Sequence, residues 1–303
     1  MPKTVAALDA GTNTFRILVV TENGDGTWTE RARELRFVGL GQGVDETGRL
    51  GPEAIQRGLD ALTEFARIID EYGCDKARFV ATSASRDAEN RDDFFVPASE
   101  ILGFAPELIS GEQEAQLSYS GVLSGVQDVN SPVLVVDSGG GSTELVLGDK
   151  NGIKRAVSLN IGSRRIRERC LHSDPPTPEQ IMAANDEITR QLDTVPWLGE
   201  VNTFIGVAGT ICSMAALDLG LSSYDRAAVH GSSHALDSLV AIAKMLNEMT
   251  SEQIAQLGPV APQRAKVLGA GALIVAQLAA RVGEPLIASE SDLLDGLVLA
   301  MLS

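Results

Sequence analysis

The chain has 303 residues, which exceeds the usual size of a single hydrophobic core and predicts two domains. Hydrophobic residues make up 44% and charged residues 22%, as in an ordinary globular protein. The net charge of −16 argues against non-specific binding of nucleic acid or of an anionic membrane, because both need Lys and Arg to neutralise phosphates. A polyanionic ligand would therefore need a local device, such as backbone amides or a metal ion.

The cysteines and the apolar segments indicate a cytoplasmic protein without a membrane partner. Three cysteines, far apart and without CxxC spacing, are typical of reduced thiols rather than of disulfides or a zinc site. Asp9 interrupts the apolar start at residues 5–8, so no signal-peptide core is expected. The longest apolar tract, residues 267–280, is too short to cross a bilayer and contains Gln277.

The beginning of the chain predicts a strand, a glycine turn and a second strand, at residues 5–8, 9–14 and 15–21. Asn, Gly and Asp at residues 23–26 are typical of a hairpin turn, so residues 28–33 are expected to return as a third strand. The pattern therefore predicts an antiparallel sheet that opens the first domain.

The remainder of the first half predicts helices around one more strand. After Pro52, apolar residues recur every three or four positions until Gly73, which predicts an amphipathic helix. A short strand follows at residues 78–82, and residues 87–102 are expected to be mostly helical.

The opening pattern then returns at residues 133–147 as a strand, an Asp-x-Gly turn and a strand. Asp137 matches Asp9, and the hydroxyl of Ser142 matches that of Thr14. This internal duplication predicts two similar domains, with a boundary within residues 125–132.

The second half continues with alternating helix and strand signals. Residues 175–178 predict a loop and a helix start, and residues 204–207 predict a strand that leads into a glycine turn at 208–210. Helices are expected at residues 238–249, with Asp237 as the N-cap, and at residues 262–282.

The two glycine turns are candidate phosphate sites, because a turn without Cβ atoms lets backbone N–H groups approach an oxyanion. Either turn alone could be an ordinary tight hairpin, but the repeated acid favours a functional role. Asp137 and Glu144 flank the second turn and are suited to Mg²⁺.

Three further segments have both an ordinary and a functional interpretation. The strand-to-helix loop 82–86 could bind an anion through Arg86 or could be a capped helix with an exposed Arg. The segment 110–117 is an ordinary helix start unless its acids act in catalysis. His230 and His234 are four residues apart, but the intervening glycine and serines favour a loop over a metal site.

The segments 9–14, 82–86, 110–115, 137–144 and 206–210 resemble, in order and spacing, the exopolyphosphatase/guanosine-pentaphosphate phosphohydrolase (Ppx/GppA) family in its short two-domain form. The resemblance implies an α/β fold of two ribonuclease-H-like domains of the actin/Hsp70/sugar-kinase superfamily, with an active-site cleft between them. The domains would be residues 1–126 and 127–303, with the last helix able to pack back on the first domain.

The resemblance also implies a hydrolase that releases terminal orthophosphate from inorganic polyphosphate with Mg²⁺, or Mn²⁺ in its place, and that forms a homodimer. Glu114 matches the glutamate that orients and deprotonates the attacking water, with Glu144 as a second catalytic acid. Asp9, Asp137 and Glu144 match the acids around the metal. The phosphate-binding residues are Gly11, Thr12, Asn13, Thr14, Ser83, Arg86, Gly139, Gly140, Gly141, Ser142, Thr143, Gly209 and Thr210.

Three departures from the family pattern bear on the substrate. Gln113 stands where many members have Glu, and Gly39 replaces an Arg. The chain also lacks the helical C-terminal extension of longer relatives, so short polyphosphate chains are expected to be preferred. Alternatives are the 5′-phosphate of guanosine pentaphosphate (pppGpp) as substrate, a non-catalytic sensor of polyphosphate or (p)ppGpp, and a sugar or acetate kinase.

Overall fold

The structure is a computed structural model that describes residues 2–126, 129–149 and 151–303. Contacts within the chain divide it into a first unit, which runs to Gly121 and includes Leu293–Ser303, and a second unit, Val122–Asp292. The last residues thus return to the first unit, whereas the boundary after residue 126 stays a prediction.

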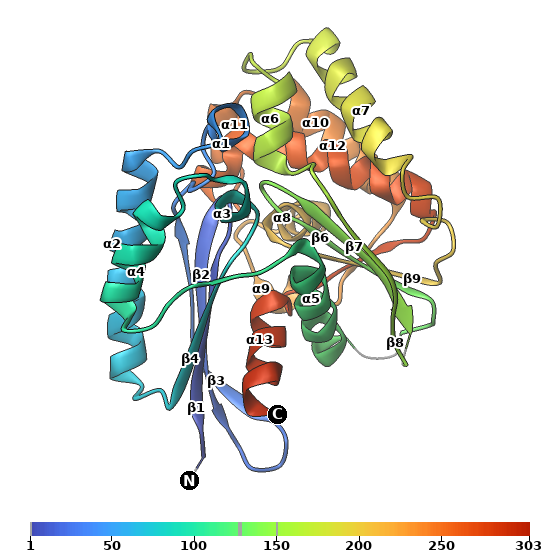
Figure 1. The fold of residues 1–303 in the computed structure, drawn as a ribbon. Coiled ribbons are helices and arrows are strands. Elements are labelled where there is room, and N and C mark those ends of the chain that lie inside the picture. The colour runs from blue at the N-terminus through green and yellow to red at the C-terminus, as the bar shows by residue number, and fades with distance from the viewer. Residues whose placement is uncertain (1, 127–128, 150) are drawn as a thin grey trace. The chain divides into compact units, whose positions relative to one another are not determined.

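The first unit is built on a five-stranded sheet of order β3-β2-β1-β4-β5 (Figure 1). The two hairpin connections expected from the sequence are confirmed, since β2 pairs antiparallel with both β1 and β3. The remaining two strands run parallel to β1. The strands are β1 (Thr4–Ala10), β2 (Thr14–Glu22), β3 (Trp28–Phe37), β4 (Lys76–Ala81) and β5 (Glu107–Leu108).

Helices cover both faces of this sheet, because alternate residues of a strand point to opposite faces. Ala6 and Leu8 of β1 belong to the cluster that packs under α2 and α4, and Val5 and Ala7 to the cluster under α13 (Figure 1). Residues 87–102 divide into the end of one helix and a second one. The helices are α1 (Val44–Thr47), α2 (Pro52–Glu71), α3 (Ser83–Asp87), α4 (Asp92–Leu102), α5 (Gly111–Gly125), which continues into the second unit, and α13 (Leu293–Leu302).

The second unit contains a six-stranded sheet of order β10-β11-β9-β6-β7-β8. Without the edge strand β10, this order and its strand directions repeat those of the first sheet, which confirms the duplication and the predicted α/β class. The strands are β6 (Val133–Ser138), β7 (Thr143–Asp149), β8 (Gly152–Leu159), β9 (Thr203–Val207), β10 (Ser233–His234) and β11 (Leu286–Ala288).

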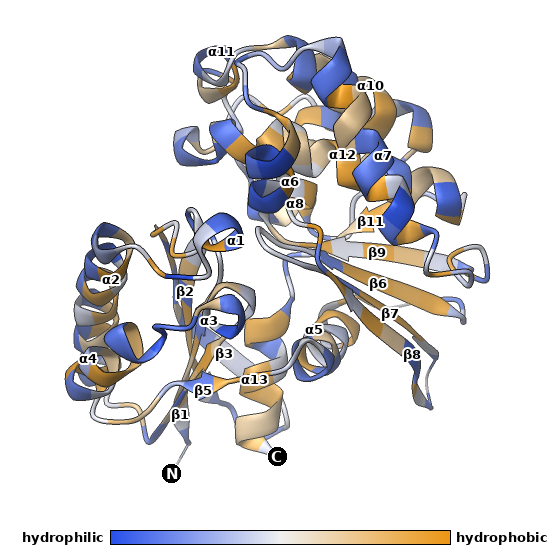
Figure 2. Ribbon diagram, turned by 45° about the horizontal axis from the view of Figure 1, so that its top comes forward, coloured by the Kyte–Doolittle hydropathy of each residue, from blue (hydrophilic) through white to orange (hydrophobic). Residues whose placement is uncertain are grey.

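The helices of the second unit surround a large aliphatic cluster. The tract 267–280, expected to be too short to cross a bilayer, lies within the longer helical segment Pro262–Val282, which is long and apolar enough to do so by length and composition. Its most apolar window is 67% buried, however, as in a core helix. Figure 2 shows hydrophobic residues along this helix. The helices are α6 (Ser163–Cys170), α7 (Pro178–Leu192), α8 (Gly209–Asp218), α9 (Arg226–Val229), α10 (Leu236–Glu248), α11 (Ser251–Ala255), the 3-10 turn Pro262–Arg264 and α12 (Ala265–Val282).

One predicted cap is wrong. Asp237 lies inside the first turn of α10, and Ala235 is the N-cap residue. An aspartate in the first turn stabilises a helix by interacting with its dipole, and an aspartate at the N-cap stabilises it by a hydrogen bond. The sequence pattern at the start of a helix therefore fits either position.

Candidate functional site

The two glycine turns share one internal hydrogen bond. Gly11 N donates to Thr14 O at 3.0 Å, and Gly139 N donates to Ser142 O at 3.0 Å. The flanking strands also pair in the same register, so that Asp9 faces Arg16 and Asp137 faces Glu144. The duplication therefore extends to individual bonds and side-chain positions.

In the turn of the second unit, the carbonyl groups face the start of α6. Gly139 O accepts from Ser163 N at 3.0 Å, and Gly140 O accepts from Arg164 N at 2.9 Å. Gly141 O accepts from Arg165 Nε at 2.7 Å.

A trans peptide points its N–H opposite to its C=O, so the amides of Gly140, Gly141 and Ser142 point away from α6. Successive amides that point one way form an anion-binding concavity. Gly139 differs, because its amide is used within the turn.

Gly162 makes this arrangement possible. A Cβ atom there would lie 2.5 Å from the carbonyl carbon and oxygen of Gly140 and 2.6 Å from the nitrogen of Gly141. The backbone before α6 can therefore approach the turn only without a side chain. Thr143, also predicted to bind phosphate, donates its buried hydroxyl to Ile161 O at 2.7 Å.

The turn of the first unit is held from behind in a similar way. Thr12 O accepts from Gly41 N at 3.0 Å, and Asn13 O accepts from Gly39 N at 2.9 Å. The Asn13 amide therefore points away from this segment. Gly39 has a φ of 64°, a left-handed conformation that favours glycine and accounts for the departure noted at this position.

The acids beside the two turns have different partners. Asp9 Oδ2 accepts from Arg16 Nη2 at 2.7 Å and from Arg16 Nε at 3.1 Å, so its charge is already compensated. As a metal ligand, Asp9 stays a prediction.

Glu144 is 1% exposed and accepts from Ser158 Oγ at 2.7 Å, while Asp137 lies opposite it on the next strand. Like charges directly opposite each other destabilise a sheet, and a cation between them would relieve this repulsion.

In the described ranges, no group of three or more His, Cys, Asp and Glu could hold a metal. Mg²⁺ nevertheless fits, because it is commonly held by one or two carboxylates together with water and substrate phosphate.

Glu114 lies in direct contact with Arg86, so two residues predicted separately come together in the first unit. Arg86 Nη1 lies 2.6 Å from Glu114 Oε2 and 3.1 Å from Ile109 O. Glu114 is 8% exposed, in the first turn of α5. The guanidinium therefore stabilises Glu114 as a carboxylate, and a phosphate bound by Arg86 would compete for the same group.

The start of α5 also explains Gln113. Ser110 Oγ accepts from Gln113 N at 3.2 Å, and Gln113 Oε1 accepts from Ser110 N at 2.9 Å. This reciprocal capping box accepts Gln or Glu equally, so Gln113 preserves the turn that presents Glu114.

The start of α8 presents Gly209 and Thr210, and sequence reasoning missed a residue there. Arg264 Nη1 donates to Gly209 O and, at 3.1 Å, to Ser213 Oγ. Any Cβ at Gly209 would collide with this guanidinium. Arg264 therefore brings a positive charge to the predicted phosphate site, although nothing near it in the sequence distinguishes it from a surface arginine.

Two buried serines were also missed. Ser85 Oγ and Ser138 Oγ lie in the described part of the chain without a hydrogen-bond partner, although both residues are almost fully buried. Leaving a buried hydroxyl unsatisfied costs about 1–3 kcal/mol. Both lie within predicted site segments, at 82–86 and 137–144. Ser83, which was predicted to bind phosphate, is also buried, at the start of α3.

Ala208 is strained, with φ 76° and ψ 165°, a region populated essentially only by glycine. We expect Ala208→Gly to raise the free energy of unfolding by roughly 1 kcal/mol, since such strain costs about 1–3 kcal/mol and glycine's extra unfolded-state entropy offsets part of the gain. Urea unfolding measures the change. The control Ala183→Gly, at an exposed position within α7, should instead destabilise by about 1 kcal/mol. Equal losses in both variants would contradict the strain.

Comparisons with known proteins place this arrangement among phosphatases. Residues 19–303 match the model of the Ppx/GppA phosphatase family. Exopolyphosphatase 2 of Mycobacterium tuberculosis is 41% identical over 314 residues, covering 98% of each chain. The crystal structure of an exopolyphosphatase-like protein has a TM-score of 0.95 at 40% identity, covering 99% of this chain and 98% of that one. Guanosine-5'-triphosphate,3'-diphosphate pyrophosphatase of Vibrio atlanticus is 33% identical over 83% of this chain and 50% of its own.

Proposed function

The chain belongs to the Ppx/GppA phosphatase family, and from this premise we propose that it is an exopolyphosphatase, a hydrolase that releases orthophosphate from the end of inorganic polyphosphate. The observation that carries the proposal is the turn Gly139–Ser142, in which the amides of Gly140, Gly141 and Ser142 point the same way beside the strand pair of Asp137 and Glu144. Such a turn binds phosphate oxygens without basic side chains, which resolves the conflict with the net charge of −16.

In the proposed reaction, the residues of each unit have separate tasks. The amides of Gly140, Gly141 and Ser142 bind oxygens of the terminal phosphate, while Arg86 and Arg264 offset its negative charge. Glu114 accepts a proton from water as the water oxygen forms a bond to the terminal phosphorus. The bond between that phosphorus and the bridging oxygen breaks, and the shortened chain leaves with the electron pair. Positioning and charge compensation supply most of the rate enhancement in phosphoryl transfer.

We propose that Asp137 and Glu144 hold Mg²⁺, or Mn²⁺ in its place. A bound divalent cation would neutralise charge on the phosphate oxygens. Ser158 supports this role, because its bond to Glu144 Oε1 orients the carboxylate.

We propose two alternative substrates. Short polyphosphate is our first proposal, since Gly39 contributes no basic side chain where other members have one. Hydrolysis of pppGpp is the second, and the similarity to the Vibrio atlanticus enzyme favours it as an alternative. A non-catalytic sensor is disfavoured, because a sensor would not need a buried Glu114 held as a carboxylate.

Phosphate release from polyphosphates of defined length, with Mg²⁺ and with EDTA, tests this function. We expect release that stops when EDTA removes the metal and resumes when Mg²⁺ is added in excess, with faster turnover on short chains. Equal rates on long and short chains would contradict the length preference. Absence of release from every polyphosphate, together with release from pppGpp, would assign the second substrate.

A further inference from the structure

Helix α5 is one of the two connections between the units. The chain passes from the first unit to the second after Gly121 and returns after Asp292. Glu114 lies in the first turn of α5, and Gly125 at its end belongs to the second unit. At ~1.5 Å per residue, about 16 Å of rigid helix separates them, so a contact that fixes Gly125 also fixes the helix that carries Glu114.

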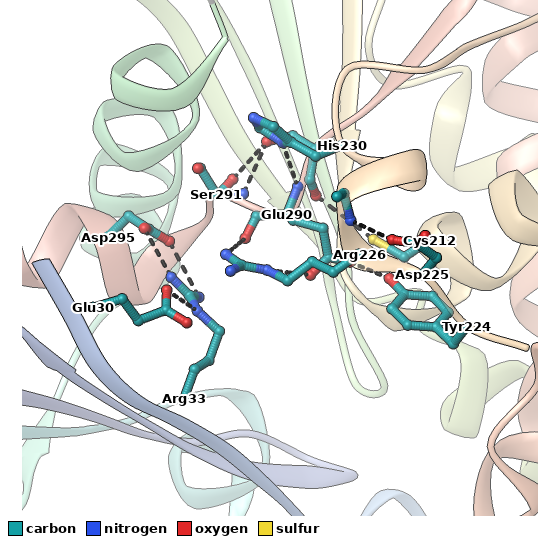
Figure 3. Close-up of polar contacts among 12 residues, drawn as sticks. Glu30, Arg33, Cys212, Tyr224, Asp225, Arg226, His230, Glu290, Ser291 and Asp295 are labelled. Atoms are coloured by element: carbon teal, nitrogen blue, oxygen red, sulfur yellow. Dashed lines mark hydrogen bonds and ion pairs between the residues drawn. The ribbon is translucent and has the colours of Figure 1, made fainter.

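His230 joins this end of α5 to the second connection, residues 289–292, which leads back to the first unit and is called the returning segment below. Its Nε2 lies 3.2 Å from Gly125 O. Its Nδ1 accepts from Glu290 N at 3.1 Å (Figure 3). Because Nδ1 accepts, Nε2 carries the proton and donates to the carbonyl of Gly125. One neutral imidazole thus forms a hydrogen bond to each of the two connections, both within the second unit.

The two connections also pack directly against each other. A Cβ atom on Gly125 would lie 2.7 Å from the Cβ of Ser291 and 3.4 Å from Cε1 of His230. Gly125 therefore allows the end of α5 to touch the returning segment, and any side chain there would push the two apart.

The returning segment is anchored independently of His230. Arg226 Nε donates to Glu290 Oε2 at 3.1 Å, and the Tyr224 hydroxyl bonds to Glu290 Oε1 (Figure 3). Burial raises the pKa of Tyr224, so its hydroxyl stays protonated and donates.

The same segment also contacts α8 through a buried cysteine. Cys212 Sγ lies 3.6 Å from Ser289 O. Burial raises the pKa of this thiol, and the nearby Glu290 charge raises it further. The segment is thereby fixed to α8, the helix that presents Gly209 and Thr210.

We propose that His230 is a positioning residue for the reaction: by bridging Gly125 and Glu290, it sets the placement of α5 and hence of Glu114. The proposal rests on the proposed function for its effect on catalysis, while the bridge itself can be tested without substrate. His230 bonds to the carbonyl of Gly125 and to the amide of Glu290, so it acts through the helix.

The test compares His230→Ala, His230→Gln and the control His172→Ala, at an exposed histidine. We expect His230→Ala to lower kcat for phosphate release by about 10- to 100-fold, because small misplacements far from the chemistry have effects of this size. KM should change little, because the phosphate-binding turns stay intact. Gln carries both an acceptor and a donor, so His230→Gln should restore most of kcat. An unchanged kcat in His230→Ala, or an equal loss in His172→Ala, would overturn the proposal.

Hydrogen exchange without substrate separates this proposal from the proposed function. In His230→Ala, the amide of Glu290 and the last turn of α5 should exchange faster than in the unmodified protein. Unchanged exchange would refute the bridge even if the protein proves to be an exopolyphosphatase. Faster exchange in a protein that releases no phosphate would retain the bridge and reject the proposed function and the catalytic role built on it.

A pair of size changes gives a second test that does not alter His230. Gly125→Ala should lower kcat as His230→Ala does, because the new methyl group displaces the end of α5. Adding Ser291→Gly removes the colliding atoms and should restore kcat. Failure of the double variant to recover, while it remains folded, would count against the contact as the cause.

Discussion

Glu114→Gln is expected to lower kcat for polyphosphate hydrolysis by about 10²- to 10⁴-fold, the usual contribution of a positioned general base. The amide keeps the size of the side chain but cannot accept a proton from water. Arg86 would lose its ionic partner at 2.6 Å and be more available to phosphate, so KM should stay the same or fall. Steady-state phosphate release at several polyphosphate concentrations measures both constants.

The matched control is Glu112→Gln, an exposed glutamate in the same first turn of α5. It removes the same charge from the same helix end and should leave kcat unchanged. Comparable losses in both variants would indicate a general electrostatic effect. Full activity in Glu114→Gln would show that another group accepts the proton.

Gly162→Ala is expected to reduce activity by about 100-fold, because the amides of the glycine turn would be displaced from the phosphate. The new methyl group would lie 2.5 Å from the carbonyl of Gly140, and these neighbours are backbone atoms that cannot rotate away. Overpacking of this kind also costs about 1–3 kcal/mol of stability. Phosphate release and urea unfolding, measured on the same preparation, give both effects.

Gly51→Ala serves as the comparison, since Gly51 has a φ of −74° and a methyl group there would meet no atom within 4 Å among the described residues other than its chain neighbours. Alanine at this position should leave activity unchanged. It should also raise the free energy of unfolding by about 0.4–1 kcal/mol, because it lowers the conformational entropy of the unfolded chain. If Gly162→Ala behaved in the same way, the turn would not depend on the close approach of the two backbones.

Much of the fold followed from sequence because its signals are local. The glycine turns at 9–14 and 137–144, and the periodic helix after Pro52, depend on neighbours only a few residues away. The duplication then related the two sheets without any knowledge of tertiary contacts.

What escaped prediction depends on contacts between distant segments. The pairing of Arg86 with Glu114 and the approach of Arg264 to Gly209 join residues that no periodicity connects. The conformation of Ala208 runs against its own preference and is imposed by its surroundings, as is common near functional sites. Propensities contain no information about such imposed features.

The return of α13 to the first unit has a consequence for synthesis on the ribosome. Leu297 and Val298 are fully buried against the sheet face that includes Val5 and Leu18, and Asp295 Oδ1 lies 3.0 Å from Arg33 Nη2. Domains generally fold as units, N-terminal first, as the chain emerges. Here the first strands expose an apolar sheet face until α13 is translated. A nascent or prematurely terminated chain would therefore present an aggregation-prone hydrophobic surface to chaperones and to other copies.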